Sequence, residues 1–413
     1  MKKNGEKRIS NVLLISFFSM LTPMILATGV LGSSSYLAVL YMIGYAILLF
    51  SFFMLFVTSN MKISMNSMVI FLLYAVILTL PVINDVVKGI SIDYYDPLNA
   101  VIKALNFFIF YVLLRNMRIG REGLYRFVRG LVLFSVLVCL FSVVFEFKEI
   151  LSIRTTTNTN VLKISSIFSN RNQYSAFLVI ALISNLYAYM LKPKKSNILI
   201  MGLQLLCILT TFSRAALFSS IIILGLMFLQ MKNVQKKTMI IVMGGIIGLG
   251  VLVTTGALDY FLKNYVRLEQ SGDSGRFNLW RYAWDVAKEN LFTGVGFYTG
   301  VDIARARGMK LTQFHNMFFD LLVNGGIPEV TFIIGLLFTT YRRCVKHCCD
   351  NKVVAVYRAA FVAFVFYAFF ESISVLALSY GDTMYSIFFI SLPLLMANLE
   401  QDDGKNEMIE SKA

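Results

Sequence analysis

One polar stretch of the chain combines residue types that can bind a phosphate group and move a proton. It extends from Leu258 to Asn316, carries eight Lys and Arg residues, and contains His315, one of the two histidines of the protein. An imidazole can take a proton from a hydroxyl group near neutral pH, and the planar forks of Arg276 and Arg281 can bind phosphate oxygens through paired hydrogen bonds. A histidine that is hydrogen-bonded at a helix start would explain His315 equally well.

Both arginines lie in a segment, GRFNLWRYAWDVAKEN, whose aromatic residues recur at helical spacing. Phe277, Trp280 and Trp284 are predicted to form one apolar face, and Arg276 lies on the same side of a turn as Trp280. Flat indole rings can stack on the face of a sugar. The alternative interpretation is an amphipathic helix on a membrane surface, with both tryptophans as interface anchors.

Further polar residues stand next to apolar runs. Arg214 lies in TTFSRAALFSS, and a charged group near a membrane is usually functional, although an interfacial arginine can also snorkel to the lipid headgroups. Asn316 can orient the neighbouring imidazole or a substrate hydroxyl group. Lys103, Asp320 and Glu329 fall in the outer parts of predicted spans, where each either lines a cavity or faces water.

Two patterns are partly similar to a nucleotide-binding motif and to a metal-binding motif, but their sequence context and spacing do not fit these motifs. Gly294-Val-Gly296 predicts a tight turn, but it does not open a strand–turn–helix unit, so a dinucleotide fingerprint is excluded. Three cysteines accompany His347 between positions 344 and 349 without CxxC spacing. We therefore expect no metal site and no cofactor.

The residues above must be positioned by a membrane domain, because the composition does not fit a soluble protein. Of the 413 residues, 57% are hydrophobic and 15% are charged, with a mean hydropathy of +0.71. Apolar runs of membrane-spanning length predict an all-α integral membrane protein with about 12 transmembrane helices. The expected spans are Val12–Val30, Tyr36–Val57, Met68–Asn84, Leu98–Leu114, Phe127–Phe145, Tyr174–Leu191, Ile198–Phe212, Ala215–Met231, Thr238–Thr254, Asn316–Tyr341, Val354–Phe370 and Tyr380–Leu399.

The net charge of +15 is explained by basic loops and not by nucleic-acid binding. Lys and Arg gather in the first eight residues and in the segments 115–129, 192–195, 232–237 and 342–352. Because cytoplasmic loops carry an excess of Lys and Arg, both termini are predicted to be cytoplasmic. The predicted organisation is helices one to nine in 1–257, one large extracytoplasmic catalytic loop with short helices in 258–315, helices ten to twelve in 316–399, and a cytoplasmic tail in 400–413.

The order of these motifs is more specific than any one of them. Ser-Arg after a span is followed by Gly-Arg with a tryptophan, then Gly-x-Gly, then His-Asn at a span start and a glycine pair nine residues later. This order resembles that of the O-antigen ligase and polysaccharide polymerase family of bacterial envelope enzymes. The segment FSNRNQYSA is similar to the Asn-bearing start of a mid-chain span in that family. The matching residues are Ser213, Arg214, Gly275, Arg276, Trp280, Gly294, Gly296, His315, Asn316, Gly325 and Gly326.

The resemblance implies a metal-independent membrane glycosyltransferase in the cytoplasmic membrane of a bacterium. Its substrate would be a glycan carried on undecaprenyl diphosphate, and the protein would also contact membrane lipid. Its protein partners would be the flippase and the chain-length regulator of the same pathway. His315 would be the base, while Arg214 and Arg276 would hold the diphosphate. Substrate-binding roles would fall to Arg281, Asn316, Trp280, Tyr282, Arg171 and Asn172.

The function expected from the sequence is polymerisation of lipid-linked repeat units into capsular polysaccharide or exopolysaccharide. The same family also contains ligases, which move a finished glycan to another acceptor, and the sequence does not separate the two. A transporter or flippase is the alternative of a different class. Such folds usually carry internal repeats and polar sites at the bilayer midplane, whereas the charges here cluster at one face and in one loop.

Overall fold

The protein is helical throughout the part that its structure describes. The computed structural model describes residues 2–26, 37–59, 63–152, 164–168, 170–230, 244, 275–310, 312–377 and 379–399. Within these ranges the chain forms helices and connecting segments and no strand. The predicted all-α class is therefore confirmed for the described residues.

The helices follow the apolar runs of the sequence. The first part of the chain contains α1 (Lys2–Ile25), α2 (Leu37–Thr58), α3 (Met65–Lys88), α4 (Tyr95–Phe107), the π-helix η3 (Phe108–Leu113), α5 (Arg121–Phe145), α6 (Phe147–Ser152), α7 (Arg171–Leu191), α8 (Lys195–Thr210) and α9 (Arg214–Gln230). The second part contains α12 (Arg276–Ala287), α13 (Phe297–Ala306), α14 (Met317–His347), α15 (Asn351–Ala368), α16 (Tyr380–Ser386), the π-helix η6 (Ile387–Ser391) and α17 (Leu392–Met396).

Seven of the described helices are long and apolar enough to cross a membrane. They are Val39–Thr58, Met65–Lys88, Tyr95–Leu113, Arg121–Phe145, Arg171–Leu191, Met317–His347 and Asn351–Ala368. Shorter apolar helices cover Arg8–Pro23, Lys195–Thr210, Arg214–Gln230 and Gly381–Met396. The expected span at 238–254, the first part of the polar stretch and the tail at 400–413 lie outside the described residues. The number of twelve spans thus stays a prediction.

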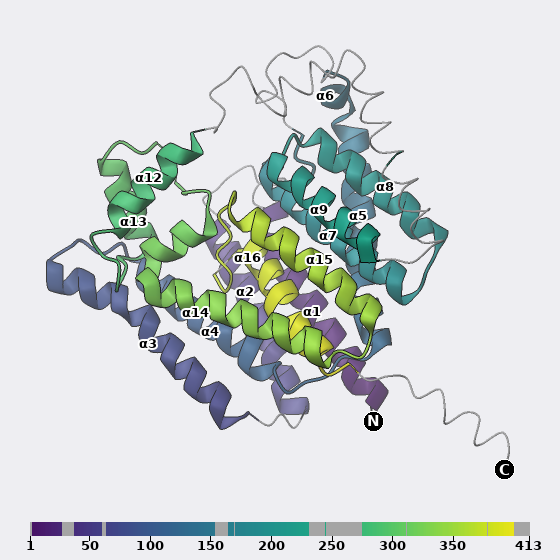
Figure 1. Cartoon of the computed structure of the whole chain (residues 1–413), viewed down its shortest axis with the longest axis horizontal. Coiled ribbons are helices and arrows are strands. Elements are labelled where there is room, and N and C mark those ends of the chain that lie inside the picture. The colour runs from purple at the N-terminus through teal and green to yellow at the C-terminus, as the bar shows by residue number, and fades with distance from the viewer. Residues whose placement is uncertain are drawn as a thin grey trace.

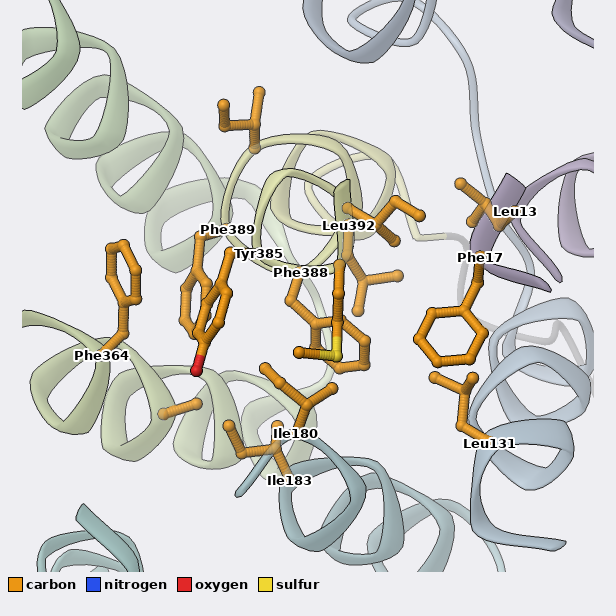
Figure 2. Close-up of a cluster of buried hydrophobic side chains, with 14 of the residues drawn as sticks. Leu13, Phe17, Leu131, Ile180, Ile183, Phe364, Tyr385, Phe388, Phe389 and Leu392 are labelled. Carbon is orange, nitrogen blue, oxygen red and sulfur yellow. The ribbon is translucent and has the colours of Figure 1, made fainter. Parts of the chain in front are cut away.

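The last helical run, formed by α16, η6 and α17, lies at the centre of the bundle. Every residue from Thr383 to Ala397 is buried. Figure 2 shows Tyr385, Phe388, Phe389 and Leu392 surrounded by Phe364 of α15, Ile180 and Ile183 of α7, Leu131 of α5, and Leu13 and Phe17 of α1. A helix that is apolar on all sides can face either lipid or protein, and this one is enclosed by protein. This span is therefore held by protein on all sides, whereas the α3 span is only 28% buried.

A smaller apolar core holds α12 and α13 beside the bundle. Its buried members include Leu279, Val286, Val301, Phe314 and Val323. Figure 1 shows the two helices at left, next to the first part of α14 and away from α5, α7, α8 and α9. The described part of the polar stretch thus carries two short helices, while its extracytoplasmic location stays a prediction.

Candidate active site

His315 lies immediately before α14, in a backbone conformation that is rare for residues other than glycine. Its φ is 52°, and such a left-handed conformation costs ~1–3 kcal/mol unless the surroundings enforce it. Its backbone N–H donates to Ser372 Oγ at 3.0 Å, and its side chain is 22% exposed. The neighbouring structure therefore fixes the position of this histidine while leaving the imidazole partly open to solvent.

Glu371 joins His315 to Arg276. One carboxylate oxygen of Glu371 lies 2.8 Å from Arg276 Nη2, and the other lies 3.3 Å from His315 Nδ1. The arginine side chain is 20% exposed and that of the glutamate 11%. The Arg276 guanidinium also lies 5.8 Å from the centroid of the Phe370 ring, close enough for a cation–π interaction. The structure thus brings together two predicted catalytic residues that lie far apart in the sequence.

Arg276 is positioned by packing of α12 against the bundle. The helix starts directly after Gly275, which has a φ of 76°. The Trp280 ring lies 6.1 Å from the Phe319 ring and 6.4 Å from the Phe370 ring. Trp280 therefore anchors α12 to α14 and to the end of α15, and its predicted contact with sugar stays a prediction.

The predicted apolar face of α12 is not the face that it buries. Phe277 and Trp284 are 65% and 48% exposed, although the Phe277 ring contacts Trp280 at 5.2 Å. The buried stripe consists instead of small and aliphatic residues, Leu279, Ala283, Val286 and Ala287. Of the three aromatic residues predicted to form one apolar face, only Trp280 is partly buried, so protein packing of α12 relies on the smaller residues. The alternative of a helix on a membrane surface stays a prediction.

The Gly-x-Gly turn is a docking element between the polar stretch and α14. The N–H groups of Val295 and Gly296 donate to the carbonyl oxygens of Val323 and Asn324, each at 3.0 Å. A Cβ atom at Gly294 would lie 2.2 Å from the carbonyl oxygen of Asn324. Glycine is required here because the two backbones touch.

The glycine pair of α14 supplies the other half of this docking element. Helical geometry is interrupted at Gly325, with φ −131°, and at Gly326, with φ 66°. A Cβ atom at Gly326 would lie 2.5 Å from the carbonyl oxygen of Leu291, and the N–H of Ile327 donates to that same oxygen at 2.7 Å. The interruption thus frees backbone groups of α14 that pair with the chain between α12 and α13.

A buried ion pair fixes the interrupted part of α14. Lys103 Nζ lies 2.8 Å from Glu329 Oε1, and the two side chains are 2% and 0% exposed. The second carboxylate oxygen accepts a hydrogen bond from Asn324 Nδ2, and Asn324 Oδ1 accepts one from the backbone N–H of Phe297 at 3.0 Å. Neither charged residue faces water, so the sequence alternative of a hydrated interface position was wrong for both.

The start of α13 is capped from another part of the chain. The Asp96 carboxylate accepts hydrogen bonds from the N–H groups of Tyr298 and Thr299, at 2.9 and 2.8 Å. Burial raises the pKa of the Tyr298 hydroxyl to about 12, and the nearby carboxylates of Asp382 and Asp96 act in the same direction. This phenol therefore stays protonated near neutral pH and cannot serve as the base there.

Arg214 begins α9 at the same end of the bundle as Glu371. Ser219 Oγ of α9 donates to the carbonyl oxygen of Ala363 at 3.4 Å, and the Phe218 ring lies 6.2 Å from that of Phe366. Phe218 and Ser219 belong to the first part of α9, whereas Ala363 and Phe366 belong to the last part of α15. The start of α9 therefore lies beside the end of α15. The predicted phosphate-binding arginine therefore lies on the side of the bundle that carries the Glu371 cluster.

Arg171 and Asn172 form the start of α7 and are partly buried. Tyr187, near the end of α7, lies close to Cys344 and Cys348 at the end of α14. The start of α7 therefore lies at the end of the bundle where α14 begins. The structure thus places both residues on the side of the candidate site, and their role in binding substrate stays a prediction.

Arg281 and Tyr282 lie on other faces of α12 than Arg276. Arg281 is exposed and lies near Asp285, whose pKa is lowered by a hydrogen bond from Lys288 and by nearby cationic groups that include Arg281. Tyr282 packs against the smaller apolar core. Of Arg276 and Arg281, it is Arg276 that makes the described ion pair with Glu371, which favours it for the central role.

Asn316 holds the scaffold around the histidine. Its Oδ1 accepts hydrogen bonds from the N–H groups of Phe318 and Phe319, at 2.9 and 3.2 Å. Its Nδ2 donates to the carbonyl oxygen of Phe369 at 3.1 Å. The amide thus caps α14 and ties it to the end of α15, and its role toward substrate stays a prediction.

Glu371 was not among the residues predicted from the sequence. It follows an aromatic run at the end of α15 and stands in a segment, 371–382, that contains no Lys or Arg. A lone carboxylate among apolar residues beside a membrane is itself a signal of function. That signal was present in the sequence, but nothing in the local pattern names its partners.

Comparison with known proteins identifies one family. Residues 199–334 match the model of a family described as O-antigen ligase, and no curated protein matches the chain. The matched range includes Arg214, Arg276, His315 and the glycine pair, and it ends before Glu371. The resemblance drawn from the motif order is confirmed for this range. Members of that family are membrane enzymes of the ligase and polymerase kind that process glycans.

Proposed function

We propose, from the membership of residues 199–334 in the O-antigen ligase family, that the chain is a lipid-linked glycan polymerase. It would join oligosaccharide repeat units carried on undecaprenyl diphosphate into capsular polysaccharide or exopolysaccharide. The observation that carries the proposal is the convergence of Arg276 and His315 on Glu371, at 2.8 and 3.3 Å. The arrangement supports the proposal because a guanidinium that can bind phosphate and an imidazole that can accept a proton then lie on one carboxylate.

In the proposed reaction the acceptor hydroxyl gives its proton to His315, and its oxygen attacks the anomeric carbon of the donor sugar. A carbon–oxygen bond forms between the two glycans, and the bond between the anomeric carbon and the diphosphate breaks. The lipid diphosphate leaves with the electron pair. Its negative charge needs preorganised cationic stabilisation, which Arg276 and Arg214 supply, with Arg281 assisting.

The reaction would take place at the outer face of the cytoplasmic membrane of a bacterium. The support is the basic bias of alternate loops, which predicts that both termini lie inside and the stretch from 258 to 314 lies outside. The proposed partners are the flippase that delivers the lipid-linked unit and the regulator that limits chain length. Polymerase is preferred to ligase because nothing in the sequence suggests a dedicated acceptor lipid.

The decisive experiment uses the purified full-length protein and lipid-linked repeat units. Removing a general base typically lowers the rate ~10²- to 10⁴-fold, so His315→Ala should form almost no polymer while His347→Ala stays active. Chelator should leave the wild-type rate unchanged. Substantial turnover by His315→Ala would sink the assignment of the base. Products that appear only on an added acceptor glycolipid, with no lengthening of the carrier-bound glycan, would establish a ligase.

A further inference from the structure

Glu371 is held rigidly at the end of α15. Its backbone N–H donates to the carbonyl oxygen of Tyr367 at 3.1 Å, which extends the last turn of the helix. The next residue, Ser372, accepts the backbone N–H of His315. Glu371 and Ser372 together therefore position both the main chain and the imidazole of His315. The Glu371 carboxylate stays close to both His315 and Arg276.

The Glu371 carboxylate contacts both Arg276 and His315, and in the proposed reaction these two side chains place opposite requirements on it. Arg276 has to offer its positive charge to the diphosphate, whereas the charge is offset in this structure by an ion pair at 2.8 Å. His315 has to present Nε2 as a proton acceptor, which requires the hydrogen on Nδ1, the atom that faces Glu371 at 3.3 Å. A hydrogen bond at one ring nitrogen determines the tautomer of the other.

We propose that Glu371 is a shared counter-ion that couples diphosphate binding to orientation of the base. In the substrate-free enzyme it neutralises Arg276. When a polyprenyl diphosphate binds the Arg276 guanidinium, the Glu371 carboxylate loses this ion pair and keeps its contact with His315. It then accepts a hydrogen bond from Nδ1–H of His315, while Nε2 receives the proton of the acceptor hydroxyl. Glu371 is thus a positioning residue. The inference rests on the proposed function and concerns the regulation of that same site.

The proposal and a purely structural role of Glu371 predict opposite changes in diphosphate binding when the carboxylate is removed. A carboxylate that only holds the fold would, when removed, weaken substrate binding and turnover together. A carboxylate that competes with the diphosphate for Arg276 restrains binding, while its bond to His315 supports turnover. Neutralising it should therefore tighten binding of the diphosphate and slow the reaction.

The experiment compares Glu371→Gln, Glu371→Asp and Glu289→Gln in the full-length protein in lipid nanodiscs. Glu289 is a matched control, because it makes an ion pair with Arg307 at 2.9 Å on the same stretch but is 52% exposed. The probes are fluorescent polyprenyl diphosphate and polyprenyl monophosphate, measured by equilibrium binding without any glycan. Turnover is measured separately with lipid-linked repeat units.

Glu371→Gln is expected to bind the diphosphate about tenfold more tightly, since a charge-assisted hydrogen bond no longer competes. Its turnover should fall at least ~10²-fold, the lower end of what a general base contributes. Glu371→Asp should recover part of the turnover, and Glu289→Gln should match the wild type in both measurements. Tighter binding by Glu371→Gln would itself demonstrate that the variant is folded.

Binding by Glu371→Gln that is unchanged or weaker, while the wild type prefers the diphosphate to the monophosphate, would overturn the inference and leave the proposed function standing. Unchanged turnover by this variant would overturn it as well. A wild-type protein that binds the diphosphate no better than the monophosphate would contradict the proposed function, and the inference would fall with it.

Discussion

The Lys103–Glu329 pair offers a test of how the interrupted helix is held. The two charges are 2.8 Å apart with side chains 2% and 0% exposed. At an effective dielectric constant of about 20 their attraction is roughly 6 kcal/mol, but withdrawing each ion from water costs several kcal/mol. The pair is therefore near neutral in net terms, while removal of one partner strands a buried charge.

Lys103→Met and Glu329→Gln should each lower the free energy of unfolding by about 3–5 kcal/mol. The double variant should recover most of this loss, because no charge is stranded and the glutamine carbonyl can still accept from Asn324. The control is the Lys192–Glu122 pair, which is shorter at 2.6 Å but exposed at 46% and 55%. Lys192→Met should cost less than about 1 kcal/mol.

The assay is reversible unfolding in mixed micelles, followed by circular dichroism, for both pairs in parallel. Exposure and not distance decides the outcome if the reasoning is correct. Equal costs for Lys103→Met and Lys192→Met would refute it. A double variant whose loss equals the sum of the two single losses would refute the compensation argument, since the two sites would then be independent.

Three further outcomes follow from the site and its scaffold. Arg276→Lys and Arg214→Lys should lose most polymer, measured as amount and length at matched protein levels, because lysine lacks the planar fork; Arg281→Lys should retain it, and the reverse pattern would exchange the roles. Gly294→Ala should cost about 2–4 kcal/mol in unfolding experiments, since its Cβ would meet the Asn324 carbonyl at 2.2 Å with φ at 68°. Ser271→Cys should react with an impermeant maleimide in intact cells, and labelling only after permeabilisation would invert the predicted topology.

The helices were predictable because the length of an apolar run in the sequence indicates a membrane-spanning helix. The runs that gave Met68–Asn84 and Phe127–Phe145 as expected spans lie inside α3 and α5. The final expected span, Tyr380–Leu399, is built from α16, η6 and α17. Its central position was not predictable, since an apolar helix can face lipid or protein and composition does not distinguish the two.

The catalytic candidates were predictable by residue type, whereas their contacts were not. His315 stands out because the chain has only two histidines, and Arg276 stands out because it precedes a tryptophan by one helical turn in the polar stretch. Glu371 lies 56 and 95 residues from these two partners, and Lys103 lies 226 residues from Glu329. Such pairings arise from the packing of whole helices, so no local pattern in a single sequence could specify them.

The two ionic clusters near α14 differ in a way that fits their proposed roles. The Lys103–Glu329 pair is almost fully buried, and its glutamate also binds Asn324, so no substrate can reach it. The Arg276–Glu371–His315 cluster is 11% to 22% exposed at each side chain. An ion pair that a diphosphate must open has to be accessible to the diphosphate. For a pair that holds an interrupted helix, exclusion of water makes the loss of either partner costly, because the remaining charge is stranded. Burial of the first pair and partial exposure of the second are therefore what a fixed scaffold beneath an exchangeable counter-ion requires.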